Sequence, residues 1–389
     1  MIQTGIDILF HDGCSALKGR RIGLLANPAS TTSDLRHTSD VLHSCGITLL
    51  CLFGPQHGYT GETQANMIEW EGYTHPKLGI PVYSLYGRKR EPEQSVLENL
   101  DTVVIDLPDV GARPYTYLWT AVLTMQACAE AGVEILVCDR PNPIGGGLVE
   151  GPPLDMRYKS FVGLYPLPMR HGLTIAEALK MIHGRDGVRC TLNIIKMEGW
   201  RRSMFYEDTE IPWILPSPNI PAVDTALVYP GSVLIEGTNV SEGRGTTKPF
   251  EIIGAPWIDQ DDFAGALSRA DLTGVLFRPI SFKPTWDMYR DECCGGVQLH
   301  VLDRSHFQPV RCGYTIIEAA ARLYPDHFRW KEPPYEYEWE LLPIDLISGS
   351  SSLRETIDTG GEVAELFRSW EKEEDRFREE REEYLLYER

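Results

Sequence analysis

The stretch that most constrains this chain is residues 47–62, ITLLCLFGPQHGYTGE, where an unbroken apolar run stops at a glycine–proline pair and continues as a polar loop. The run is too short for a convincing helix and is bounded by turn residues, which favours a strand covered on both faces. In open α/β sheets, ligands bind beyond the carboxyl ends of the strands. The loop, which holds Gln56, His57 and Glu62 between glycines, is therefore a candidate site.

Short apolar strands alternate with helical patterns through the first half of the chain. This alternation predicts βα units and a parallel sheet. Thr174 followed by Glu177 is a capping-box pattern at the start of one helix. We expect strands at 21–27, 47–53, 81–86, 102–107, 134–139 and 191–197, and helices at 34–45, 92–100, 117–131 and 174–183.

Five prolines punctuate residues 212–230, a stretch without a long periodic segment. Proline-rich connectors link compact domains, and a chain of 389 residues is longer than one core usually supports. We predict an α/β protein with a Rossmann-like parallel-sheet N-terminal domain, 1–221, and a smaller α+β C-terminal domain, 222–389. In the second domain we expect strands at 274–282 and 297–302, helices at 260–270 and 315–324, and an acidic helix at 364–387 that is solvated or docks.

Several classes of function are disfavoured by what the sequence lacks. No G-x-G-x-x-G follows the first strand and no G-x-x-x-x-G-K-[ST] occurs, so we expect no nucleotide cofactor. The net charge of -19 disfavours nucleic acid and anionic membrane surfaces. The first residues, MIQTGIDILFHDG, do not read as a secretory signal, and the nine cysteines show no disulfide framework. We therefore expect a cytoplasmic protein that binds neither nucleic acid nor membrane.

Polar loops follow four of the predicted strands, and parallel strands bring such loops to one edge of the sheet. Hydrolysis of a glycosidic bond needs one carboxyl group to protonate the leaving oxygen, and commonly a second carboxylate to attack or to activate water. A further polar loop at 235–251 adds acidic residues from the second half. The candidate carboxyl groups are Glu62, Asp106, Asp109, Glu236, Glu242 and Glu251.

Cationic side chains in the same loops are candidates for binding an acidic sugar. Arg113, Arg140 and Arg244 could each hold a carboxylate through two parallel hydrogen bonds. A metal site is the less favoured alternative, because neither H-E-x-x-H nor paired CxxC spacing occurs. The side chains that would be acceptable metal ligands once folded together are His57, Asp106, Asp109 and His171.

Seven polar motifs rich in glycine and proline follow one another along nearly the whole chain, at residues 54–58, 106–113, 139–143, 149–152, 170–172, 216–219 and 236–246. In that order they resemble the NamZ-type exo-β-N-acetylmuramidases, glycoside hydrolases formerly grouped as a domain of unknown function, DUF1343. The resemblance implies a site in a cleft between two domains. It also implies removal of terminal N-acetylmuramic acid from the non-reducing end of peptidoglycan fragments, here in cell-wall recycling.

One position departs from that family, in which many members have glutamate where this chain has Gln56. An amide cannot donate a catalytic proton as a carboxylic acid does. The acid role then passes to Glu62 or to a carboxylate of the second domain, with Arg244 or Arg113 holding the lactyl carboxylate. The alternatives are a protein that binds muropeptides without cleaving them, or a glycosidase for a different amino sugar. We predict catalytic roles for Glu62, Glu242, His57 and Asp106, and substrate binding by Gln56, Asp109, Arg113, Tyr115, Arg140, Asn142, His171, Asn239 and Arg244.

Overall fold

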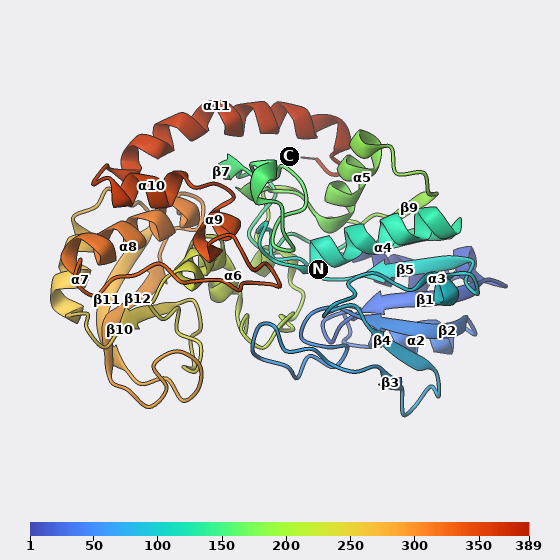
Figure 1. Cartoon of the computed structure of the whole chain (residues 1–389). Coiled ribbons are helices and arrows are strands. Elements are labelled where there is room, and N and C mark those ends of the chain that lie inside the picture. The colour runs from blue at the N-terminus through green and yellow to red at the C-terminus, as the bar shows by residue number, and fades with distance from the viewer. Residues whose placement is uncertain (389) are drawn as a thin grey trace.

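The larger of the two main sheets has seven strands in the order β3-β4-β2-β1-β5-β6-β9 (Figure 1). The computed structural model describes residues 1–388. Every neighbouring pair in this sheet is parallel except β3 with β4. All six strands predicted for the first half are present in this sheet, and of its seven strands only the short β3 was not expected. Their bounds are β1 (Arg21–Ala26), β2 (Thr48–Gly54), β3 (Tyr73–Thr74), β4 (Pro81–Ser84), β5 (Thr102–Asp106), β6 (Glu134–Cys138) and β9 (Leu192–Ile195).

Helices cover both faces of this sheet, which explains why its strands are apolar throughout. Successive residues of a strand point to opposite faces. Leu25 packs in the cluster that contains residues of α4 and α5, whereas Leu24 packs in the cluster that contains residues of α1 and α2. The predicted capping box is confirmed, since Thr174 Oγ1 accepts from the backbone of Glu177 at 3.2 Å. The helices are α1 (Gly5–His11), α2 (Thr38–Ser44), α3 (Gln94–Leu97), α4 (Tyr117–Ala131) and α5 (Ile175–Asp186).

The second half of the chain builds an antiparallel sheet in the order β10-β12-β11 with helices packed around it, as the α+β prediction required. A two-stranded sheet, β7 with β8, belongs to neither main sheet. The strands are β7 (Glu150–Pro153), β8 (Pro168–Arg170), β10 (Ile252–Ala255), β11 (Val275–Phe282) and β12 (Cys294–Val301). The helices are α6 (Val223–Ser232), α7 (Gln260–Ser268), α8 (Pro309–Leu323), α9 (Pro343–Ser348) and α10 (Ser352–Asp358).

Helix α6 corrects the prediction that residues 212–230 contain no long periodic segment. Its only internal proline, Pro230, cannot donate to the carbonyl of Ala226, so the helix lacks one hydrogen bond near its C-terminal end. The helix is stabilised by close packing on α8, because Gly231 and Gly313 let the two backbones approach each other. Helix α8 also begins six residues earlier than predicted, with Pro309 at its first turn.

Helix α11 (Val363–Arg381) arches over both halves of the molecule, from α10 to the neighbourhood of α5 (Figure 1). Its buried side chains hold it to its own chain: Glu374 accepts from the backbone N of Gly151 at 3.0 Å, and Arg381 donates to the carbonyl of His171 at 2.9 Å. The residues after it continue onto the N-terminal half, where the Tyr387 hydroxyl donates to Asp139 at 2.5 Å. The acidic helix therefore docks. No helix among residues 1–388 is both long and apolar enough to cross a membrane.

Candidate active site

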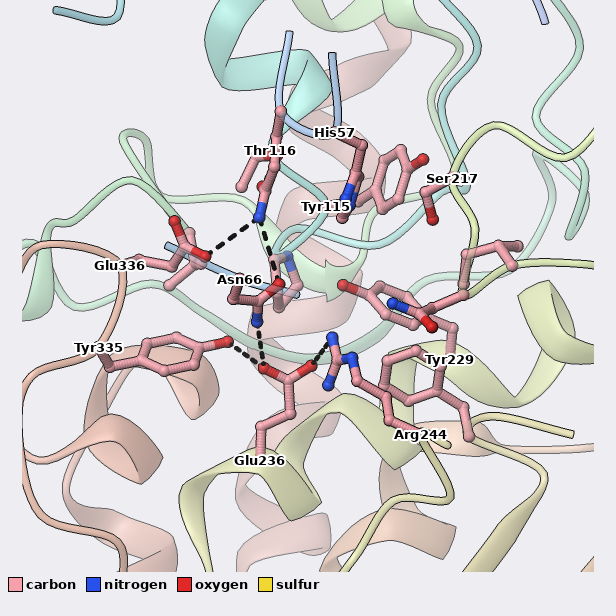
Figure 2. A pocket seen from close by; sticks show the side chains of 16 residues that line it. His57, Asn66, Tyr115, Thr116, Ser217, Tyr229, Glu236, Arg244, Tyr335 and Glu336 are labelled. Atoms are coloured by element: carbon pink, nitrogen blue, oxygen red, sulfur yellow. Dashed lines mark hydrogen bonds and ion pairs between the residues drawn. The ribbon is translucent and has the colours of Figure 1, made fainter. Parts of the chain in front are cut away.

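A cavity lies where loops of the N-terminal half meet the C-terminal half. The N-terminal half contributes the loop after β2 and the turn that precedes α4. The C-terminal half contributes the short helix at Val233–Gly237 and the turn at 335–338. Figure 2 shows His57, Tyr115 and Ser217 on one side of this cavity and Glu236, Arg244 and Tyr335 on the other.

Gln56 and His57 reach the cavity because β2 ends just before them. The Gln56 amide oxygen accepts from Thr116 Oγ1 at 2.6 Å, and its amide nitrogen donates to Glu336 at 3.2 Å. His57 has a left-handed backbone, with φ of 71°, and its Nδ1 lies 2.6 Å from the carbonyl of Thr63. The carbonyl can only accept, so Nδ1 carries the proton and Nε2 is an acceptor. Burial lowers the pKa of His57 to about 4, so the imidazole is neutral at pH 7.

Glu236 is held as a carboxylate by an ion pair with Arg244, at 2.8 Å. Its second oxygen accepts from the hydroxyl of Tyr335 at 2.8 Å and from the amide of Asn66 at 3.1 Å (Figure 2). Arg244 also pairs with Glu242 at 2.5 Å. One guanidinium therefore lies between two carboxyl groups, and burial raises the pKa of Glu242. Arg244 Nε has no hydrogen-bond partner among the described residues.

Glu336 is the second carboxyl group of the cavity and is 3% exposed. Its oxygens lie 3.0 and 3.1 Å from the hydroxyl of Tyr86. Burial raises the pKa of Glu336 to about 7, and the charge of Glu236 acts in the same direction. Two buried carboxyl groups thus share one cavity, one charged and the other holding a proton over part of the neutral range. That is the acid–base equipment that glycosidic hydrolysis requires.

The structure brings Gln56, His57, Tyr115 and Arg244 together, and places Glu242 immediately behind Arg244. Tyr115 packs edge-on against Tyr229 on the cavity wall. The remaining predicted site residues do not line this cavity: Glu62, Asp106, Asp109, Arg113, Arg140, Asn142, His171 and Asn239.

Most of those eight residues have a local structural partner. Asp106 is fully buried and pairs with Arg140 at 2.6 Å. Arg113 donates to the backbone carbonyls of residues 167 and 347. The amides of Asn142 and Asn239 also bond to backbone groups. These contacts hold the loops at the sheet edge, and the site roles predicted for these residues stay predictions.

Glu62 and the pair Asp109 with His171 are placed differently. Glu62 is exposed and accepts from the Thr60 hydroxyl in its own loop. Asp109 lies 3.5 Å from His171 Nε2 and, with Arg140, lines a separate pocket. His57 is in the cavity, so the four residues considered as metal ligands do not meet. Across residues 1–388 there is no group of three or more His, Cys, Asp or Glu side chains arranged to hold a metal.

Several residues of the cavity escaped prediction, and those that bond to its carboxyl groups include Asn66, Tyr335 and Glu336. Glu236 was considered among the carboxyl groups without being assigned a role. The available signal for Glu336 was an acidic residue between aromatics in the segment 333–337, PPYEY, which is unusual for a solvated loop. Nothing in the sequence indicates that this segment reaches a loop 280 residues earlier.

Comparison with known proteins agrees with the class that the fold and cavity define, a two-part α/β glycosidase. Residues 22–224 match the N-terminal model of exo-beta-N-acetylmuramidase NamZ, and residues 227–387 match the C-terminal model. The peptidoglycan beta-N-acetylmuramidase NamZ of Bacillus subtilis (strain 168) is 43% identical over 99% of this chain and 91% of its own length. The chain belongs to the NamZ exo-beta-N-acetylmuramidase family.

Two solved structures of DUF1343 family proteins from Bacteroides fragilis NCTC 9343 have the same fold. One is 35% identical with a TM-score of 0.90, and the other is 29% identical with a TM-score of 0.78. In both cases the match covers 100% of this chain and 99% of the other. The expected fold and family membership are thereby confirmed.

Proposed function

We propose that this protein is an exo-acting glycoside hydrolase that releases N-acetylmuramic acid from the non-reducing end of peptidoglycan fragments. The observation that carries the proposal is the pair of buried glutamates, Glu236 and Glu336, in one cavity at the junction of the two halves. The Arg244 ion pair keeps Glu236 charged, whereas Glu336 holds a proton more tightly than an ordinary glutamate. The B. subtilis relative supplies the substrate class.

The charges of the cavity support an acidic terminal sugar as the part that binds deepest. Arg244 Nε is an uncommitted donor at this cavity and supports the predicted role of Arg244 in holding the lactyl carboxylate. The Arg113 alternative has less support, because that guanidinium is fully buried against backbone carbonyls.

Two further aspects of the proposal concern organisation and location. We place the domain boundary near residue 222, because α6 begins at Val223 and the two family models meet between residues 224 and 227. We place the reaction in the cytoplasm, on imported fragments. The nine cysteines are free thiols in the described chain, which suits a reducing compartment.

The test is product analysis with purified protein, using MurNAc-GlcNAc and a GlcNAc-terminated disaccharide as control. We expect release of N-acetylmuramic acid from the first substrate alone. Glu236→Gln and Glu336→Gln should each lower the rate by at least about 100-fold, as loss of a catalytic carboxyl group does. Glu71→Gln, at an exposed carboxylate of the segment between β2 and β3, is the matched control. Equal cleavage of both disaccharides, or of neither, would refute the assignment.

A second candidate is a muropeptide-binding protein that does not hydrolyse its ligand. It is favoured by one observation: Gln56, which lines the cavity, has a neutral amide that cannot donate a catalytic proton. This candidate predicts that calorimetry detects N-acetylmuramic acid binding while product analysis shows no turnover at any pH between 5 and 9. Turnover that is lost in Glu336→Gln would exclude it.

A further inference from the structure

Glu336 reaches the cavity by an unusual backbone turn. Residues 335 and 338 pair through two backbone hydrogen bonds of 2.9 Å, and the two residues between them, Glu336 and Tyr337, have φ of 47° and 64°. Neither is glycine, so the left-handed backbone of this turn is strained. The turn directs the Glu336 side chain into the N-terminal half, where its partners Tyr86 and Gln56 lie.

The carboxyl group of Glu336 is oriented by donors that are themselves fixed. The hydroxyl of Thr116 can donate to the Gln56 oxygen at 2.6 Å, so the amide nitrogen of Gln56 must face the other way, toward Glu336. Asn66 strengthens this orientation, because its carbonyl oxygen accepts from the same Gln56 nitrogen at 3.3 Å. The Tyr86 hydroxyl lies within 3.1 Å of both Glu336 oxygens.

A relay of hydrogen bonds also joins the two carboxyl groups of the cavity. It runs from Glu336 to the Gln56 nitrogen, from that nitrogen to the Asn66 oxygen, and from the Asn66 nitrogen to Glu236 (Figure 2). In this relay each amide donates through its nitrogen and accepts through its oxygen, because its partners fix its orientation. The amides of Gln56 and Asn66 therefore keep the two carboxyl groups apart and in defined orientations.

We propose that Glu336 is the general acid of this cavity and that Gln56 is its positioning residue. The inference deepens the proposed hydrolysis and rests on it. Glu336 gives its proton to the glycosidic oxygen while the bond from C1 to that oxygen breaks, and the electron pair leaves with the oxygen as a neutral alcohol. Water then supplies the hydroxyl group on C1, and its remaining proton passes to Glu336, which regains the proton that it gave. Glu236 stays paired with Arg244.

The groups that face Glu336 decide its proton affinity. Burial is the largest influence and raises the pKa, to about 7, and the nearby charge of Glu236 also raises it. Tyr86, Arg90 and the Gln56 amide act in the opposite direction, because each stabilises the ionised form. Tyr337, the next residue, packs edge-on against Tyr86. Loss of the Gln56 donor should therefore raise the pKa of Glu336.

The first experiment compares leaving groups. In a 2,4-dinitrophenyl glycoside of N-acetylmuramic acid, the dinitrophenolate leaving group departs without being protonated. In MurNAc-GlcNAc, the leaving GlcNAc oxygen must receive a proton from an acid. We expect Glu336→Gln to slow disaccharide cleavage by about 100- to 10,000-fold while slowing the dinitrophenyl substrate by less than about 10-fold. Glu71→Gln, at an exposed carboxylate outside the cavity, should leave both rates unchanged.

The second experiment addresses Gln56 through the pH profile of kcat/KM on the disaccharide. Activity should fall as pH rises through the pKa of Glu336, because the acid must be protonated. In Gln56→Met this basic limb should move to higher pH, and in Glu336→Gln it should vanish. A residue with a purely structural role would lower activity at every pH without moving the limb.

The outcomes separate the two proposals. No turnover of either substrate by the unaltered protein overturns the proposed hydrolysis, and the acid assignment with it. Turnover that Glu336→Gln slows equally for both substrates overturns only the acid assignment. A basic limb that stays in place in Gln56→Met overturns only the positioning role.

Discussion

Replacing Gly231 with alanine should destabilise the protein more than any other single methyl group added to a helix of the C-terminal half. Gly231 lies on α6 where that helix crosses α8. A Cβ atom built there would lie 1.7 Å from the carbonyl oxygen of Pro309 and 3.1 Å from the backbone nitrogen of Gly313. An ordinary carbon–oxygen contact is about 3.2 Å, so the helices must separate by about 1.5 Å, which forfeits much of the dispersion attraction between them.

The expected loss is about 3 kcal/mol, the upper part of the range for overpacked cores, because the obstacle is backbone and cannot change rotamer. Thermal and urea unfolding of Gly231→Ala measure it, and for a domain of this size the melting temperature should fall by roughly 6–12 °C. Gly265→Ala in α7 is the matched control. Its Cβ would meet only the flexible end of Arg269 at 3.4 Å, so helix propensity should stabilise that variant by about 0.5–1 kcal/mol.

The same change should also lower activity, because α6 continues directly into the short helix at Val233–Gly237 that presents Glu236 to the cavity. A displacement of α6 moves that carboxylate, and misplacement of about 1 Å can cost about 100-fold in rate. If Gly231→Ala unfolds within 0.5 kcal/mol of the unaltered protein, the helices yield easily there and the reasoning from the close contact is wrong.

Three further changes test other features of the structure. Arg202→Met leaves Glu177 buried without its partner at 2.7 Å, so urea unfolding should show a loss of about 3–5 kcal/mol, and a loss below 1 would contradict the burial argument. Gln56→Glu places a second carboxyl group beside Glu336, so the two should titrate as a coupled pair and the basic limb of the pH profile should move upward; an unmoved limb would contradict it. Burial raises the pKa of Glu150 from 4.5 to about 7, so the folded state keeps a proton that the unfolded chain loses, and stability falls as pH rises across that window. Glu150→Gln should flatten this dependence by at most about 3 kcal/mol, measured by unfolding at pH 5 and pH 8, and an unchanged slope would show that Glu150 is ionised in the folded protein.

The local patterns of the sequence determined the secondary structure of the first half well. The run at residues 47–53 is β2, and the capping box at Thr174 begins α5, because both signals depend only on neighbours along the chain. Helix α6 was missed for the complementary reason. Its stability comes from the Gly231 contact with α8, a partner that no local pattern announces.

The candidate site divides in the same way. The motif at residues 54–58 marked Gln56 and His57 correctly as cavity residues, since a loop at the end of a buried parallel strand has few other places to go. Asp106 carried an equally strong signal, yet the structure places it in an ion pair with Arg140 outside the cavity. Polar residues at strand ends serve both purposes, and composition cannot separate them.

What the sequence by itself determined is the family, the α/β architecture and the N-terminal wall of the cavity, because each depends on residues that are adjacent in the chain. What only the tertiary structure decided is which carboxyl groups face each other. Glu236 and Glu336 belong to segments 100 positions apart, and each meets the loop after β2 only when the two halves pack together. Burial by that packing is also what raises the pKa of Glu336, so its chemistry exists only in the folded chain.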